Sequence, residues 1–213
     1  MTPIAAMVMP EMTTSSRQLL PVLERARAVG FLGPGPLRVH MAHADRYAEA
    51  LHPGASRLLD LGSGGGVPGL PIFAASPGLS GVLLDASARR CAFLLWAVTE
   101  LDLASRVDVW EGRAEDLAGP ETMAFDHVLC RGFGPPAQTV ECALGFTAAN
   151  GRIVISEPPE RRPWPHERLR ELGLAVDVSV TGLVSFDLVD DSVRPRPRPI
   201  KTQRRNPLFS LDP

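Results

Sequence analysis

Short apolar runs alternate with longer amphipathic segments through the middle of the chain. The apolar runs suit strands that are buried on both faces, and the segments between them have helix length. The predicted strands are 57–61, 81–85, 107–111, 125–131, 151–156, 173–180 and 185–190. The predicted helices between them begin near 68 or cover 87–103, 114–118 and 137–147. This alternation predicts an α/β fold with a mostly parallel sheet and helices on both faces.

Two further helices are predicted ahead of the sheet, at 13–29 and 37–51. The apolar positions of the second recur at steps of three and four, as on one face of a helix. They are Leu37, Met41, Ala44, Ala48 and Leu51, whereas His40, His43 and Tyr47 lie on another face. We therefore expect an N-terminal helical extension over 1–53, an α/β domain over 54–193 and a C-terminal tail over 194–213.

Composition narrows the class of protein. No apolar run approaches the ~18 to 20 residues that a membrane span needs, which predicts a soluble, cytoplasmic protein. Cys91, Cys130 and Cys142 lie inside apolar segments without metal-type spacing, so buried free thiols are expected and no metal site is predicted. The formal net charge is -2, yet residues 194–205 hold six basic residues and no acidic one. The basic charge is thus concentrated in the tail.

A glycine-rich loop follows the first predicted strand. It contains Gly62, Ser63, Gly64 and Gly66 and comes directly after Asp60. A P-loop would end in Gly-Lys-Ser/Thr, and Val67-Pro-Gly stands there instead, which excludes that class of site. A dinucleotide fingerprint would need a third glycine where Val67 stands, so that assignment is weak. The acidic residue with alternating glycines resembles motif I of class I S-adenosylmethionine-dependent methyltransferases.

Two more acidic residues follow later strands. Asp85 ends the second predicted strand, and a carboxylate there can accept hydrogen bonds from both hydroxyls of a ribose. That requirement is common to NAD and S-adenosylmethionine sites. Glu115 lies in the short helix after the third strand, where it could also be a solvated residue at a helix start.

Longer motifs identify a family. DLGSGGGVPGLPI, LLDASARRCAFL, GRAEDL and FDHVLCRGF occur in this order. Together they resemble the glucose-inhibited division protein B family, the small-subunit rRNA guanine-N7 methyltransferases G. The resemblance covers about 30–156 and implies a class I, Rossmann-like fold with a seven-stranded sheet. One departure concerns Ser156-Glu157-Pro158, because the family usually has a Leu-Lys-Gly-like turn there and Lys201 is the single lysine of the chain.

The resemblance also implies a cofactor, S-adenosylmethionine, and a partner, ribosomal RNA or the small ribosomal subunit. The candidate cofactor residues are Asp60, Gly62, Ser63, Gly64, Gly66, Asp85, Ala86, Ala114, Glu115 and Arg131. Arg131 is also the candidate catalytic residue. The candidate RNA contacts are His43, which matches a family histidine with a one-residue gap, and Arg194, Arg196, Arg198 and Lys201 in an extended Pro-Arg tail.

Guanine N7 carries a free lone pair and has no proton to lose, so its methylation requires positioning and no general base. Cys130 adjoins Arg131 but ends an apolar strand, which favours packing over a nucleophilic role. Two alternatives remain at this point. One is a small-molecule methyltransferase on the same fold, and the other is an inactive relative that binds the cofactor or RNA.

Overall fold

The computed structural model describes residues 14–195 and 198–211. Seven strands form one sheet in the order β3-β2-β1-β4-β5-β7-β6. They are β1 Arg57–Leu61, β2 Ser80–Asp85, β3 Val107–Glu111, β4 Phe125–Cys130, β5 Thr147–Ser156, β6 Leu174–Asp177 and β7 Leu183–Leu188. The first five pair in parallel, and β7 runs antiparallel to both β5 and β6. The predicted seven-stranded, mostly parallel sheet is confirmed.

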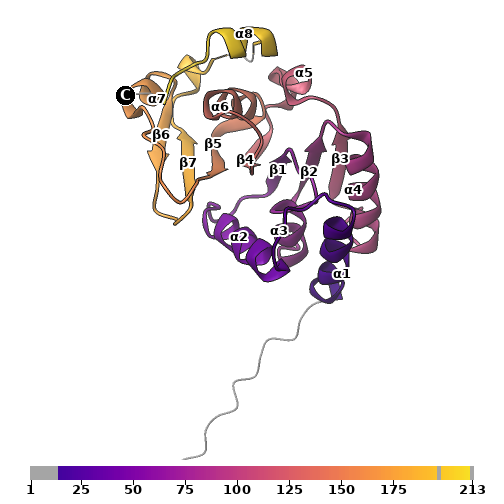
Figure 1. The fold of residues 1–213 in the computed structure, drawn as a ribbon. Coiled ribbons are helices and arrows are strands. Elements are labelled where there is room, and N and C mark those ends of the chain that lie inside the picture. The colour runs from indigo at the N-terminus through magenta and orange to yellow at the C-terminus, as the bar shows by residue number, and fades with distance from the viewer. Residues whose placement is uncertain (1–13, 196–197, 212–213) are drawn as a thin grey trace, which may run out of the picture.

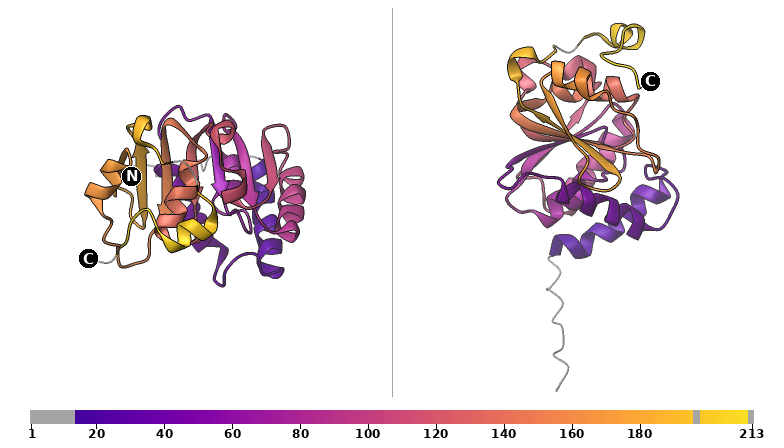
Figure 2. Two further views of the ribbon diagram at one scale, coloured as in Figure 1. Left: turned by 90° about the horizontal axis from the view of Figure 1, so that it is seen from above. Right: turned by 90° about the vertical axis from the view of Figure 1, so that its left-hand side faces the viewer.

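Helices cover both faces of this sheet (Figure 1). The α-helices are α1 Thr14–Ala28, α2 Leu37–Glu49, α3 Gly69–Ala75, α4 Ala88–Glu100, α5 Ala114–Leu117, α6 Pro136–Leu144, α7 His166–Glu171 and α8 Ile200–Arg205. Helices α1 to α4 pack on one face, and α6 and α8 lie beyond the other (Figures 1 and 2). Among the described residues, no helix is long and apolar enough to cross a membrane.

Alternate strand residues fill two hydrophobic cores. Leu58 and Leu83 point into the core beneath α1 to α4, whereas Leu59 and Leu84 point into the core beneath α6. Such near-continuous apolar strands are what a doubly covered parallel sheet requires. The two N-terminal helices belong to the first core, since Leu23 of α1 and Tyr47 of α2 are fully buried in it.

The buried face of α2 differs from the predicted one. Leu37 and Ala44 are buried as expected, but Ala48 is exposed while His40 and Tyr47 are buried. Both polar side chains satisfy their hydrogen-bonding groups inside the protein, because the Tyr47 hydroxyl donates to the Cys130 carbonyl (2.7 Å) and His40 bonds the Gly33 carbonyl (3.2 Å). A buried polar group with partners costs little, which a count of apolar positions misses.

The C-terminal segment contradicts the predicted extended basic strip. Residues 200–205 form α8, which carries Lys201 on its exposed surface. The Arg194 side chain is 5% exposed and donates to the carbonyls of Leu144 and Thr147, so it is unsuited to contact a phosphate backbone. Arg198 is held in an ion pair with Glu141. The predicted contact at Arg196 lies outside the described residues.

Candidate active site

The glycine-rich loop is fixed to the end of the neighbouring strand. The backbone N–H groups of Gly62 and Ser63 both donate to the carbonyl of Leu84 in β2, at 2.8 and 2.9 Å. Gly62 has φ +78° and Gly64 φ +58°, in the left-handed region that favours glycine. The chain therefore turns sharply out of β1 and leaves bare backbone at the edge of the sheet.

Asp85 connects this loop to the second strand. Its Oδ2 accepts the Gly64 N–H (2.9 Å) and its Oδ1 accepts the Ser87 N–H (2.9 Å). Nη1 of Arg90, in the first turn of α4, lies 3.6 Å from Oδ2. A carboxylate offers about four acceptor positions, so Asp85 retains capacity for further donors.

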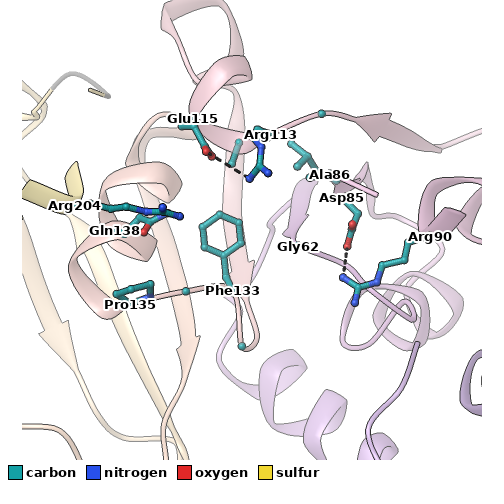
Figure 3. Close-up of a pocket in the computed structure, with 15 residues that line it drawn as sticks. Gly62, Asp85, Ala86, Arg90, Arg113, Glu115, Phe133, Pro135, Gln138 and Arg204 are labelled. Atoms are coloured by element: carbon teal, nitrogen blue, oxygen red, sulfur yellow. Dashed lines mark ion pairs between the residues drawn. The ribbon is translucent and has the colours of Figure 1, made fainter. Parts of the chain in front are cut away.

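A cavity of about 300 Å³ opens beside Asp85 at the carboxyl ends of the parallel strands. Its walls come from the ends of β1, β2, β3 and β4 and from α6 and α8 (Figure 3). It is lined by Gly62, Leu84, Asp85, Ala86, Arg90, Gly112, Arg113, Ala114, Glu115, Gly132, Phe133, Gly134, Pro135, Gln138 and Arg204. In open α/β sheets, ligands bind at this edge, near the point where the strand order reverses.

Five of the predicted cofactor residues meet in the wall of this cavity: Gly62, Asp85, Ala86, Ala114 and Glu115. The others lie behind the wall. Gly64 donates its N–H to Asp85, and the Ser63 hydroxyl, which is buried, donates to the Asp60 carbonyl (2.8 Å). Gly66 donates to the carbonyl of Ser63 and accepts from Leu70, so it joins the loop to α3. These residues shape the loop.

Sequence reasoning missed several wall residues. Arg90 follows Asp85, the acidic end of β2, by five residues, and Phe133 stands between two glycines after β4. Their neighbours in the sequence could therefore have marked both as candidates for the site. The sequence around Gln138 and Arg204 does not mark them in this way, because only the packing of α6 and α8 brings them to the cavity. The Phe133 ring is close to Gly62: a Cβ added at Gly62 would lie 2.9 Å from Cδ2 of the ring.

Asp60 is buried beneath the loop, with 1% of its surface exposed. Its Oδ2 accepts the N–H of Gly69 (3.0 Å), the first residue of α3. Burial raises the pKa of the Asp60 carboxyl to about 7, although the Gly69 N–H and the Arg131 guanidinium favour the charged form. The carboxyl thus ties β1 to α3, which differs from the direct cofactor contact that the motif suggested.

Replacing Asp60 should change how stability depends on pH. Because the folded-state pKa is raised to about 7 from 3.8, the stability linked to Asp60 is complete below pH 3.8 and is lost as the pH rises to about 7. We expect wild type to lose up to about 4 kcal/mol over this interval relative to Asp60→Asn. Thermal unfolding between about pH 4 and 7.5 measures the difference, with the exposed Asp108→Asn as control. Parallel pH profiles for wild type and Asp60→Asn would contradict this assignment.

Arg131 lies at the end of β4 and links three segments. Its Nη2 donates to Nδ1 of His40 (3.2 Å) and its Nη1 to the carbonyl of Val67 (3.4 Å). It therefore holds the loop after β1 against α2. His43 is half-buried, and its Nδ1 accepts from Arg46 (3.1 Å). Burial, followed by the charge of Arg131, lowers the pKa of His43 to about 4, so the ring is neutral at pH 7.

Cys130 is fully buried between Arg131 and the core. Burial raises the pKa of its thiol well above the usual value, which removes the thiolate that a nucleophilic role would need. All three cysteines are free and buried, as predicted. In residues 14–195 and 198–211, no group of three or more His, Cys, Asp or Glu side chains is placed to hold a metal ion.

These features suit a nucleoside-containing ligand. A carboxylate at the end of β2 can accept two hydrogen bonds from a vicinal diol. Gly62 also lines the cavity, and its missing side chain leaves room for the Phe133 ring beside it. Glu115 and Gln138 offer acceptors on the opposite wall, where a planar base could be recognised (Figure 3).

Comparison with known proteins agrees with the fold. A methyltransferase from Geobacter sulfurreducens has a similar structure, with a TM-score of 0.60 over 86% of this chain and 92% of that protein at 14% identity. This similarity shows the class I methyltransferase fold.

Relatives of higher sequence identity are named Ribosomal RNA small subunit methyltransferase G. The protein from Salinispora tropica is 40% identical over 54% of this chain and 49% of its own length. The protein from Mycobacterium marinum is 34% identical over 71% of this chain and 68% of its own length. The chain spans about half the length of the first of these.

The family model described as rRNA small subunit methyltransferase G (GidB) matches residues 37–158, from the start of α2 to the loop after β5. This match includes the glycine loop, Asp85, Glu115 and Arg131, and excludes α1 and α8. The chain therefore belongs to the GidB family of rRNA small subunit methyltransferases G.

Proposed function

We propose that this protein binds S-adenosylmethionine in the cavity beside Asp85 and transfers its methyl group to N7 of a guanine in small-subunit ribosomal RNA. The proposal rests on the residues that line the cavity. Asp85 faces the cavity with spare acceptor capacity, next to a loop whose Gly62 has no side chain. Family membership supplies the reaction and the class of substrate.

The side chains around the cavity agree with an acceptor that needs no deprotonation. Methyl transfer from a sulfonium is an in-line displacement with a neutral leaving group, and N7 of guanine already presents a lone pair. The described lining contains no cysteine, histidine or lysine. Its two acids are occupied in part by arginines, Asp85 by Arg90 and Glu115 by Arg113 at 3.9 Å. What remains for the protein is to bind and orient both partners.

In this proposal Arg131 is a positioning residue. It donates to Val67 and His40, and through them it fixes the loop that bounds the site. The His43 ring stays neutral at pH 7, so it offers RNA no positive charge. Lys201 on α8 remains an exposed cation for a phosphate contact.

A second class of substrate follows from the turn after β5. Glu157 stands where the family usually has lysine, and its side chain is 3% exposed, where it pairs with Arg162 and accepts from the indole N–H of Trp164 (3.1 Å). Glu157 supplies no positive charge for an RNA phosphate at this turn, so a small-molecule acceptor is the alternative to RNA.

One assay compares the two substrates. The protein is incubated with S-adenosylmethionine carrying a labelled methyl group and with small ribosomal subunits, deproteinised rRNA or a small-molecule extract of cells. We expect label in small-subunit RNA. Label confined to small molecules would replace the RNA proposal with the alternative, and binding of the cofactor without transfer to any acceptor would contradict both.

A further inference from the structure

The C-terminal segment is attached to α6 by contacts that the sequence did not reveal. Arg198 forms two hydrogen bonds with the carboxylate of Glu141, at 2.8 and 2.7 Å, and its backbone N–H donates to the same group. The Glu141 side chain is 1% exposed. A buried carboxylate that lost this partner would be strongly unfavourable, so the pair holds the segment in place.

Two more contacts fix α8 itself. Gln203 is 2% exposed, and its Nε2 donates to the carbonyl of Arg198 (2.7 Å) while its Oε1 accepts from the Cys142 thiol (3.7 Å). Beyond the helix, Phe209 is 7% exposed and packs edge-on against Trp164 (5.9 Å between ring centroids). We call residues 198–209 the C-terminal strap.

The strap brings Arg204 to the cofactor cavity. Arg204 follows the buried Gln203 and lies beside Gln138 of α6, across the cavity from Asp85 (Figure 3). Within the part of the chain that the structure describes, its guanidinium has neither a hydrogen-bond acceptor nor an acidic partner. Arg204 is exposed and lines the cavity, so the donors of its rigid planar group are accessible to a ligand there.

The position of Arg204 indicates which part of the ligand it contacts. Asp85 and the glycine loop occupy the wall suited to a ribose, whereas Glu115, Gln138 and Arg204 occupy the opposite wall. An adenine offers ring nitrogens that accept hydrogen bonds and an amino group that donates them. Arg204 can serve the acceptors, and Glu115 or Gln138 can serve the amino group.

We propose that the C-terminal strap completes the cofactor site, and that Arg204 donates a hydrogen bond to the adenine of S-adenosylmethionine. This inference rests on the proposed function. It adds a cofactor-binding residue from outside residues 37–158, the region that the family model matches.

The test is calorimetry with two ligands, S-adenosylhomocysteine and methylthioadenosine, which lacks the amino-acid part. Arg204→Gln should weaken both ligands by the same factor, about 10- to 100-fold, the range of a hydrogen bond to a charged group. Arg205→Gln changes the next residue of α8, which does not line the cavity, and should leave both affinities within error. Failure of wild type to bind S-adenosylhomocysteine would contradict the proposed function itself.

Other results would overturn the inference alone. A loss confined to S-adenosylhomocysteine would assign Arg204 to the amino-acid carboxylate. Unchanged affinity for both ligands together with a raised KM for RNA would make it an RNA contact, and no change at all would make it a surface residue.

Arg198→Gln tests the strap. If the strap acts by presenting Arg204, then Arg198→Gln should weaken both ligands, and the double variant with Arg204→Gln should bind no worse than Arg204→Gln alone. If the losses of affinity in the two single variants added in the double variant, the Arg198–Glu141 ion pair would affect the site independently of Arg204. Melting temperatures establish whether each variant is folded. If Arg198→Gln does not fold, the affinities of Arg204→Gln alone test the proposal.

Discussion

Asp85→Ala is expected to weaken the binding of S-adenosylmethionine by about 100-fold or more, the largest effect we expect from removing one side chain. Two hydrogen bonds from ribose hydroxyls to a carboxylate are lost, each at about 1.5 to 3 kcal/mol. The Gly64 and Ser87 N–H groups also lose their acceptor, so the loop itself is less ordered. Calorimetry with S-adenosylhomocysteine measures the change.

The matched control for this variant is Asp108→Ala, which removes an exposed carboxylate from the adjacent strand β3. It should bind as wild type does. If Asp85→Ala and Asp108→Ala both retained wild-type affinity, the cavity beside Asp85 would not be the cofactor site.

Gly62→Ala is expected to abolish cofactor binding. The new Cβ would lie 2.9 Å from Cδ2 of the Phe133 ring, so this ring, which lines the cavity, would have to shift. The variant also carries a conformational cost, since φ is +78° and a side chain there costs about 1 to 2 kcal/mol. Binding and melting temperature are therefore both measured.

Gly54→Ala separates these two effects. Gly54 has φ +83°, and an added Cβ would have nothing within 4 Å, so this variant carries the backbone cost without obstruction. Both variants should lower the melting temperature by a few degrees, about 2 to 4 °C per kcal/mol for a chain of this size. Only Gly62→Ala should lose binding. Equal affinities in the two variants would show that the glycine serves the turn alone.

The sequence predicted those parts of the structure that depend on local pattern. Apolar runs of strand length and the glycines after Asp60 place β1, the loop and the acidic end of β2 correctly, because strand burial and left-handed turns leave a signature within a few residues. Element ends were less exact: β5 begins at Thr147, inside a segment predicted as helix.

Long-range pairing was not predictable in the same way. Glu141 and Arg198 are 57 residues apart, and the sequence around either residue does not indicate that the two form a pair. The charge and proline pattern predicted an extended tail that contacts RNA, yet the buried carboxylate of Glu141 binds Arg198 and holds the segment on α6. Tyr47 is a similar case, because its buried hydroxyl is satisfied by the Cys130 carbonyl, 83 residues away.

The most direct test of the proposed function identifies the methylated atom. Small ribosomal subunits that lack the modification are incubated with S-adenosylmethionine and either wild type or Asp85→Ala, and the rRNA is digested to nucleosides for mass spectrometry. We predict 7-methylguanosine with wild type and little or none with Asp85→Ala. Methylation of another base or of another guanine atom, or equal 7-methylguanosine with both proteins, would contradict the account.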